Sequence, residues 1–175
     1  IENLTDTSTV WNHQWRAHGS QPGYGVKQSS QFLISKSTDD GLTWSEPRNI
    51  TRQVKKEKWW LLAPGPGRGI TMEDGTLVFP VEGRNEDGLQ FSTIMWSKDK
   101  GENWTVGEPA YYNTNECQVV ELSDHSLMLN MRERSNRGRQ EGNGRAIAVT
   151  ADLGKTWTEH PTSRRALIEP ACQAS

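Results

Sequence analysis

Short runs in which apolar and polar residues alternate recur along the chain, separated by turn-forming residues. The two clearest pairs of runs flank residues 73–76 and 123–126. Alternation with a period of two is typical of β-strands, and a short Asp-, Gly- or Ser-containing segment between two such runs predicts a β-hairpin. No stretch longer than a few residues has the 3.6-residue period of an amphipathic helix. We therefore predict an all-β fold.

A turn motif occurs three times, at residues 37–44, 97–104 and 150–157. All three copies fit the pattern Ser/Thr-x-Asp-x-Gly-x-Thr/Asn-Trp, and each follows a strand-like run. Asp, Ser and Thr side chains satisfy backbone donors inside a tight turn, and Gly adopts the positive φ that such a turn needs. Each copy therefore predicts a hairpin turn with its Trp packed back over the turn.

The later two turn motifs are each preceded by one of the apolar hairpins, which gives two hairpins per repeat. Two hairpins, or four strands, in roughly 50–60 residues make the unit of a β-propeller blade. The apolar hairpin of each repeat predicts a buried core inside the blade. Three repeats predict about three blades.

Composition narrows the function classes. Only 33% of the 175 residues are hydrophobic and the mean hydropathy is −0.81, but eight Trp supply large apolar side chains for a core. The net charge of −2 argues against a polybasic surface that binds nucleic acid. No apolar stretch approaches the roughly 18 residues that cross a bilayer.

Metal and cofactor chemistry has no support in the sequence. Cys117 and Cys172 lack metal-binding spacing, and the four His form no cluster. We predict that both cysteines are buried free thiols and that the protein uses no metal or cofactor.

Glu116 and Arg132 are candidate functional residues because they lie on opposite arms of one predicted hairpin, equally far from Asp124. Opposed or adjacent positions across a hairpin bring Cα atoms within roughly 5–7 Å. Both residues should emerge at the end of the blade that Arg68 and Glu82 reach from the preceding hairpin. Since a guanidinium binds a carboxylate through two parallel hydrogen bonds, this end is a candidate anion site. An ordinary cross-strand salt bridge is the commoner explanation of such spacing and stays open.

The three turn motifs resemble the Asp boxes of the sialidase (neuraminidase) family, and further segments match in order. Ala-Pro-Gly-Pro-Gly-Arg-Gly-Ile at 63–70 resembles the family's Gly-Pro-Gly segment, and 169–175 resembles a further family segment. Asn-Glu-Cys-Gln-Val-Val-Glu-Leu at 115–122 resembles the segment with the catalytic Glu, and Leu-Asn-Met-Arg at 129–132 the segment with one Arg of the substrate-binding triad. The resemblance runs from about Val26 to the C-terminus.

The resemblance implies a six-bladed β-propeller, of which residues 1–175 supply about three blades as a partial catalytic domain. It implies an exo-α-sialidase that releases terminal sialic acid from sialylated glycans with retention, using a Tyr nucleophile, which is an exception among glycosidases. Glu116 would activate that Tyr, and Arg132 would bind the sugar carboxylate. Arg68 and Gln173 are further candidates for substrate binding.

Several parts of the family pattern have no counterpart in the sequence. An Arg-Ile-Pro segment is missing, Asp6 matches the acid/base Asp only by position, and Tyr24, Tyr111 and Tyr112 do not lie where the nucleophile should. The nucleophilic Tyr and a third triad Arg are expected after Ser175. Two alternatives therefore stay open: a trans-sialidase, and a non-catalytic Asp-box propeller that binds glycan or protein.

Three N-glycosylation sequons, at Asn3, Asn49 and Asn103, favour a secreted, periplasmic or lysosomal location.

The resemblance predicts that the isolated 175-residue chain does not hydrolyse a fluorogenic sialoside, because parts of the catalytic set are not found in it. The measurement is release of the fluorophore by the purified chain. Clear turnover would contradict the view that the active site is only partly contained here.

Overall fold

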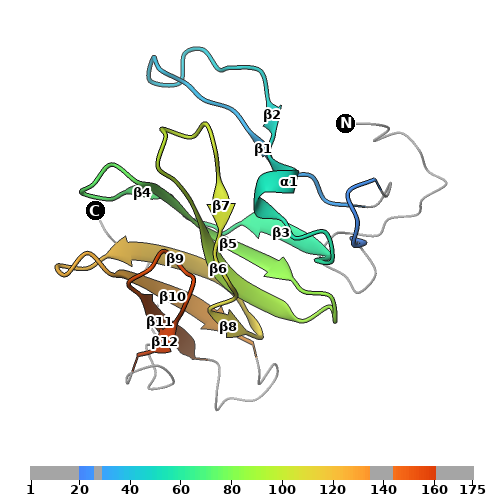
Figure 1. Cartoon of the computed structure of the whole chain (residues 1–175), viewed down its shortest axis with the longest axis vertical. Coiled ribbons are helices and arrows are strands. Elements are labelled where there is room, and N and C mark those ends of the chain that lie inside the picture. Colours follow the sequence, from blue (N-terminus) through green and yellow to red (C-terminus); the bar gives the residue numbers. More distant parts are fainter. Residues whose placement is uncertain (1–19, 26–28, 135–143, 161–175) are drawn as a thin grey trace.

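The computed structural model describes residues 20–25, 29–134 and 144–160, and it consists almost entirely of antiparallel β-strands (Figure 1). Within these ranges the one helix is the single turn α1 (Thr51–Val54), and no helix is long and apolar enough to cross a membrane. The all-β prediction is confirmed.

The middle sheet is a four-stranded blade whose edge strands are each broken in two. Its long central strands pair along their whole length, and the two segments of each edge pair with the same central strand. The central strands are β5 (Leu77–Arg84) and β6 (Gln90–Ser97); the edge segments are β3 (Leu61–Pro64) and β4 (Ile70–Thr71) beside β5, and β7 (Thr105–Val106) and β8 (Tyr111–Tyr112) beside β6.

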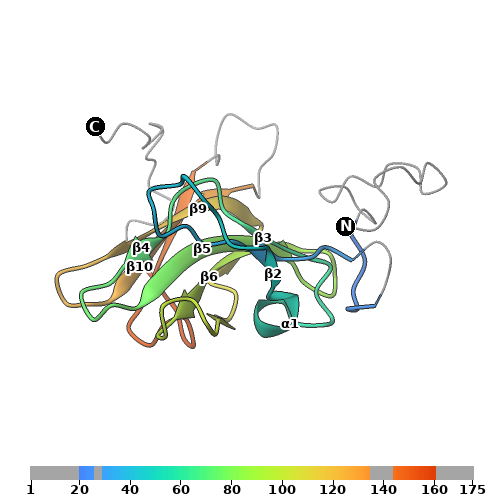
Figure 2. The same ribbon diagram turned by 90° about the horizontal axis from the view of Figure 1, so that it is seen from above.

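The next sheet is a meander in the spatial order β12-β11-β10-β9, and it packs beside β5 and β6 (Figures 1 and 2). A separate hairpin carries the first turn motif. The described residues thus hold two blades and one further hairpin, as part of a propeller; the boundaries 1–175 stay a prediction. The strands are β9 (Thr114–Glu121), β10 (Leu127–Glu133), β11 (Arg145–Thr150) and β12 (Thr158–Glu159) in the meander, and β1 (Leu33–Ile34) and β2 (Arg48–Asn49) in the hairpin.

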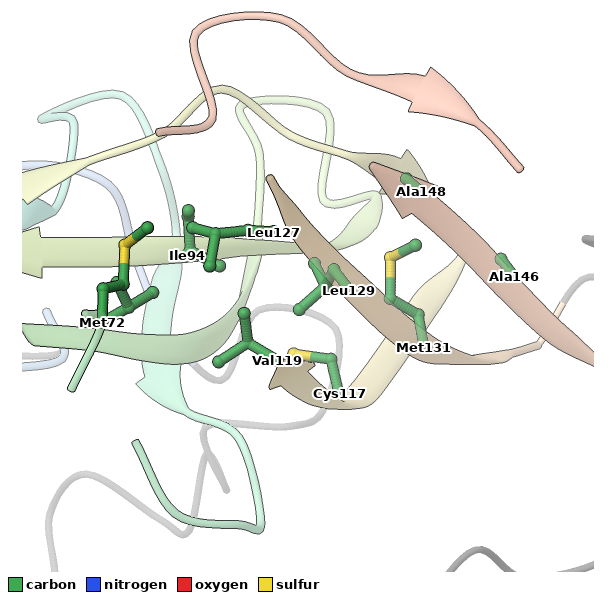
Figure 3. Packing of buried hydrophobic residues seen from close by; sticks show 10 residues of the cluster. Met72, Ile94, Cys117, Val119, Leu127, Leu129, Met131, Ala146 and Ala148 are labelled. Carbon is green, nitrogen blue, oxygen red and sulfur yellow. The ribbon is translucent and has the colours of Figure 1, made fainter. Parts of the chain in front are cut away.

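The apolar core lies between neighbouring blades, which corrects the prediction of a core inside each blade. Ile94 on one face of β6 packs with Val119 and Leu129 of the next blade (Figure 3). Phe91 and Met95, on the other face of β6, pack with residues that precede this blade in the sequence, among them Ile50 and Val54. Because side chains alternate along a strand, one strand supplies two such interfaces.

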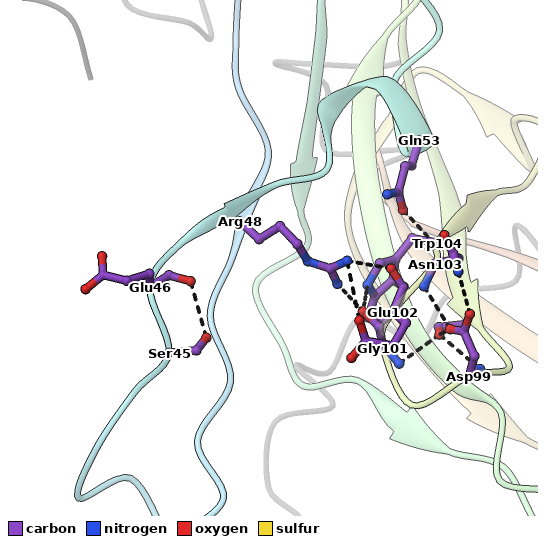
Figure 4. Close-up of polar contacts among 10 residues, drawn as sticks. Ser45, Glu46, Arg48, Gln53, Asp99, Gly101, Glu102, Asn103 and Trp104 are labelled. Atoms are coloured by element: carbon purple, nitrogen blue, oxygen red, sulfur yellow. Dashed lines mark hydrogen bonds and ion pairs between the residues drawn. The ribbon is translucent and has the colours of Figure 1, made fainter.

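The turn motifs are held by one repeated set of hydrogen bonds. In the second copy, the Ser97 hydroxyl donates to Asp99 (2.8 Å) and accepts from the Gly101 amide (2.9 Å). Asp99 also accepts from the Asn103 amide (2.8 Å) and side chain (2.7 Å) (Figure 4). Lys100 and Gly101 both have positive φ angles, of 58° and 90° respectively. These bonds favour the carboxylate and lower the pKa of Asp99 to about 2. The first and third copies repeat the pattern.

The second and third turn motifs also hydrogen-bond to the unit that precedes each of them. Arg48 donates to the Glu102 carbonyl (2.6 Å), and the Trp104 amide donates to Gln53 (2.9 Å) (Figure 4). At the next boundary, the Glu108 amide donates to the Gly154 carbonyl (2.8 Å), and the Trp157 indole donates to the Glu108 carbonyl (2.9 Å). The motifs therefore join blades as well as closing hairpins.

We expect Gly154→Ala to destabilise the intact protein more than Gly75→Ala. Both glycines have positive φ, 81° and 86°, so both substitutions carry the same backbone cost. A Cβ on Gly154 would lie 3.2 Å from both Gly107 Cα and an Ile94 side-chain carbon, whereas a Cβ on Gly75 meets nothing within 4 Å. Overpacking at the blade boundary should add about 1–3 kcal/mol to the loss. Equal losses in denaturant unfolding would contradict the boundary contact.

Candidate active site

Glu116 occupies a β-bulge in β9. The strand β10 pairs with β9 so that Met131 faces Cys117 and Arg132 faces Asn115, and Glu116 is the extra residue between them. Its φ of 38° is in the left-handed region, which costs a residue other than Gly about 1–3 kcal/mol, so the surrounding structure must hold it there. Bulges of this kind redirect a side chain. Glu116 and Arg132 are thus one register step apart, which is one of the two arrangements that the sequence allowed.

The two side chains form an ion pair. Arg132 Nη1 lies 2.6 Å from Glu116 Oε2, and the side chains are 50% and 45% exposed, respectively. Both groups are therefore accessible to a ligand while paired. The other donors of the guanidinium leave capacity for a second carboxylate.

Glu82 approaches the bulge from the neighbouring blade. It is only 6% exposed, and its Oε2 accepts a 2.6 Å hydrogen bond from the Glu116 amide. Burial raises the pKa of Glu82, and the hydrogen bond from the Glu116 amide partly opposes that shift.

A cavity of about 660 Å³ lies at this blade boundary. Burial and the nearby Arg134 guanidinium lower the pKa of Arg84. Arg84 and Arg134 line the cavity and Arg132 lies beside it, so three guanidinium groups outnumber the carboxylates of Glu82 and Glu116 among the described residues. The arrangement can accommodate an anion. The lining residues are Pro64, Pro66, Glu82, Arg84, Gln90, Asn113, Asn115, Glu116 and Arg134.

The model of the BNR repeat-like domain family matches residues 6–173. The chain belongs to this family. It is 49% identical to a sialidase of Bacteroides fragilis over 180 residues, covering 98% of the chain and 32% of that relative. A sialidase of Clostridium perfringens is 36% identical over 156 residues, covering 82% of the chain and 38% of the relative. The chain thus spans well under half the length of these two relatives, and the resemblance to sialidases is confirmed.

Solved sialidase structures share the fold of this BNR-family chain. A Hadza microbial sialidase aligns with a TM-score of 0.78 and 48% identity over 86% of the chain and 28% of that structure. Trypanosoma rangeli sialidase in complex with sialic acid aligns with a TM-score of 0.60 and 26% identity, covering 77% and 22%. An intramolecular trans-sialidase from Ruminococcus gnavus aligns with a TM-score of 0.60 and 28% identity, covering 75% and 26%.

Of the other candidate site residues named from the sequence, Arg68 lies away from the cavity, and the rest lie outside the described part of this BNR-family chain. Arg68 is exposed in the loop between β3 and β4 and does not line the cavity, although its carbonyl accepts a bond from Gln118. Its role in substrate binding stays a prediction. Gln173, Asp6 and Cys172 lie outside the described residues.

Neither the thiol of Cys117 nor the described tyrosines contribute to this cavity. Cys117 is buried and free, as predicted, and burial raises its pKa to about 12, so its thiol is not a nucleophile near neutral pH. Tyr24 donates to the Lys55 carbonyl, while Tyr111 and Tyr112 belong to β8; none of them lines the cavity. In the described ranges, no group of three or more His, Cys, Asp or Glu side chains could hold a metal ion.

Two further arginines, Arg84 and Arg134, line the cavity, although neither is among the candidate site residues named from the sequence. Arg134 follows Arg132 by two residues and comes directly after the last residue of β10. Since alternate residues of an extended chain share a side, this spacing is the signal in the sequence that points to Arg134. The sequence carries no signal that singles out the other polar lining residues, because polar residues at strand ends are common. These residues are Gln90, Asn113 and Asn115.

We expect Glu82→Gln to gain stability relative to the parent as pH rises from about 4 to 7. Burial raises the pKa of Glu82 above its ordinary value of 4.5, so its contribution to stability is fully present at low pH and is lost as the carboxyl ionises. The neutral amide has no such loss. Urea unfolding of both proteins across this pH range measures the difference; a difference that does not change with pH would contradict the buried site.

Proposed function

We propose that the intact protein is an exo-α-sialidase that releases terminal sialic acid from glycoproteins, glycolipids and oligosaccharides. The observation that carries the proposal is the Arg132–Glu116 ion pair at a cavity rich in guanidinium groups, in a chain whose relatives are sialidases. The chain covers 32% and 38% of two of those relatives, so the proposal concerns the whole protein.

In this proposal, Arg132 binds the carboxylate of sialic acid. A planar guanidinium matches a carboxylate with two parallel hydrogen bonds, and each bond to a charged group contributes about 1.5–3 kcal/mol. Its half-exposed side chain supports this role, because a fully buried ion pair would have to break before it could reach a substrate. Arg84 and Arg134 add positive potential around the same cavity.

Glu116 acts as the base that activates a tyrosine nucleophile. A phenol has an ordinary pKa of about 10, so a carboxylate must take its proton before it attacks at neutral pH. A neutral nucleophile suits an anionic sugar, because a carboxylate nucleophile would repel the substrate's own carboxylate. Since none of the described tyrosines lines the cavity, the nucleophile in this proposal comes from outside the described residues.

A trans-sialidase is the second candidate, supported by the similarity to the Ruminococcus gnavus enzyme. Product analysis separates the two: a sialidase yields free sialic acid, and a trans-sialidase yields a transferred or internally cyclised sugar. Binding of sialosides without turnover would instead favour a non-catalytic propeller. A secreted, periplasmic or lysosomal location remains part of the proposal.

We expect Glu116→Ala and Arg132→Ala each to lower kcat/KM on a fluorogenic sialoside by at least about a hundredfold in the intact protein. Glu116→Ala removes the base, and Arg132→Ala removes the guanidinium that binds the substrate carboxylate. Arg132→Lys should fall between the parent and Arg132→Ala, because it keeps the charge and loses the planar fork.

The matched control is Lys58→Ala, which breaks a similarly exposed ion pair with Glu86 outside the cavity. It should keep activity within about twofold, since exposed pairs contribute little to stability. Thermal melting of every variant separates lost chemistry from lost fold. Near-normal activity in Glu116→Ala or Arg132→Ala would refute the assignment.

A further inference from the structure

We propose that Glu82 is a positioning residue that holds Glu116 in its bulged conformation across the blade boundary. This inference rests on the proposed role of Glu116 as a base. Glu82 acts through the Glu116 backbone, and its own carboxylate takes no part in the chemistry.

The bulge explains why Glu116 needs such a partner. Met131 and Arg132 of β10 pair with Cys117 and Asn115, so Glu116 has no counterpart in the ladder. Its φ of 38° is one that a side chain with a Cβ rarely adopts, and such a conformation persists where neighbouring groups over-determine it. The Glu116 amide instead donates to Glu82 Oε2, at 2.6 Å.

Glu82 is well suited to fix that amide in space. It sits in β5 between two partner strands, opposite Ala63 of β3 and Ser92 of β6, so its backbone is held on both sides. Its side chain is 6% exposed and therefore has little rotamer freedom. A short hydrogen bond to a carboxylate is of the stronger, charge-assisted kind.

The blade that carries Glu82 makes a second close contact with the bulge, at Cys117. Gly65, which follows β3, lies so close that an added Cβ would be 2.9 Å from the Cys117 carbonyl. The Cys117 thiol in turn hydrogen-bonds to the Val81 carbonyl, next to Glu82. Glu116 and the residue after it, Cys117, are thus both held by the neighbouring blade, and the Glu116 carboxylate is directed to Arg132, 2.6 Å away.

The test compares Glu82→Gln with Glu82→Met in the intact protein. Both substitutions remove the charge and keep a side chain of similar length, but only Gln retains an oxygen that accepts the Glu116 amide. We expect the Gln variant to keep kcat within about threefold, and the Met variant to lose kcat by about tenfold or more with KM changed less than about threefold. Equal effects of the two substitutions would overturn the inference.

A double-mutant cycle distinguishes positioning from direct substrate contact. In a Glu116→Ala background, Glu82→Met should lower the residual kcat by less than about twofold, because the residue it positions is gone. The same tenfold loss in that background, or a loss confined to KM, would show that Glu82 acts on the substrate itself.

Thermal melting checks that each variant folds. If the Met variant does not fold, Glu82→Asp replaces it in the test, because Asp keeps the charge and withdraws the acceptor by one methylene. An unchanged kcat of Glu82→Asp would overturn the inference, and a lowered kcat would support it. Normal activity of Glu116→Ala would instead refute the proposed function, whereas an inactive Glu116→Ala beside a fully active Glu82→Met refutes only the positioning role.

Discussion

The contact between neighbouring blades is the interaction on which the rest of this structure depends. The large apolar side chains fill the spaces between sheets, so that β6 supplies Ile94 to one interface and Phe91 to the other. A sheet must cover its apolar faces with another element, and here the neighbouring sheet does so. Polar contacts then fix how the sheets meet: Glu108 with Gly154 and Trp157 where the third turn motif meets the preceding blade, and Glu82 with Glu116 beside the cavity.

The candidate active site is a product of the same boundary. Glu82 and Arg84 come from β5 of one blade, while Glu116 comes from β9 of the next blade and Arg134 directly follows β10 of that blade. Neither blade alone brings these groups together. Any change that alters the packing angle between the two sheets therefore also alters the distance between the carboxylates and guanidinium groups of the cavity.

Features set by local chemistry could be predicted from the sequence, and features set by packing could not. The three turn motifs were evident because Asp99 and its equivalents bond within four residues of themselves, and the glycine marks the positive φ. Register across one hairpin likewise placed Arg132 beside Glu116. The left-handed φ of Glu116 had no such signal, since neither Gly nor Asn stands there and its amide partner lies on another blade. Cores between blades escaped prediction for the same reason.

A buried carboxylate and a left-handed glutamate are each unfavourable alone, and here each compensates for the other. Burial raises the free energy of ionised Glu82, and the Glu116 amide lowers it again by hydrogen bonding to Oε2. The same bond offsets the backbone strain of the bulge. Replacing Glu82 by an apolar residue would leave the Glu116 amide without this acceptor, whatever side chain stands at position 116. The bond therefore fixes the backbone of the bulge, and with it the place from which the Glu116 carboxylate reaches Arg132.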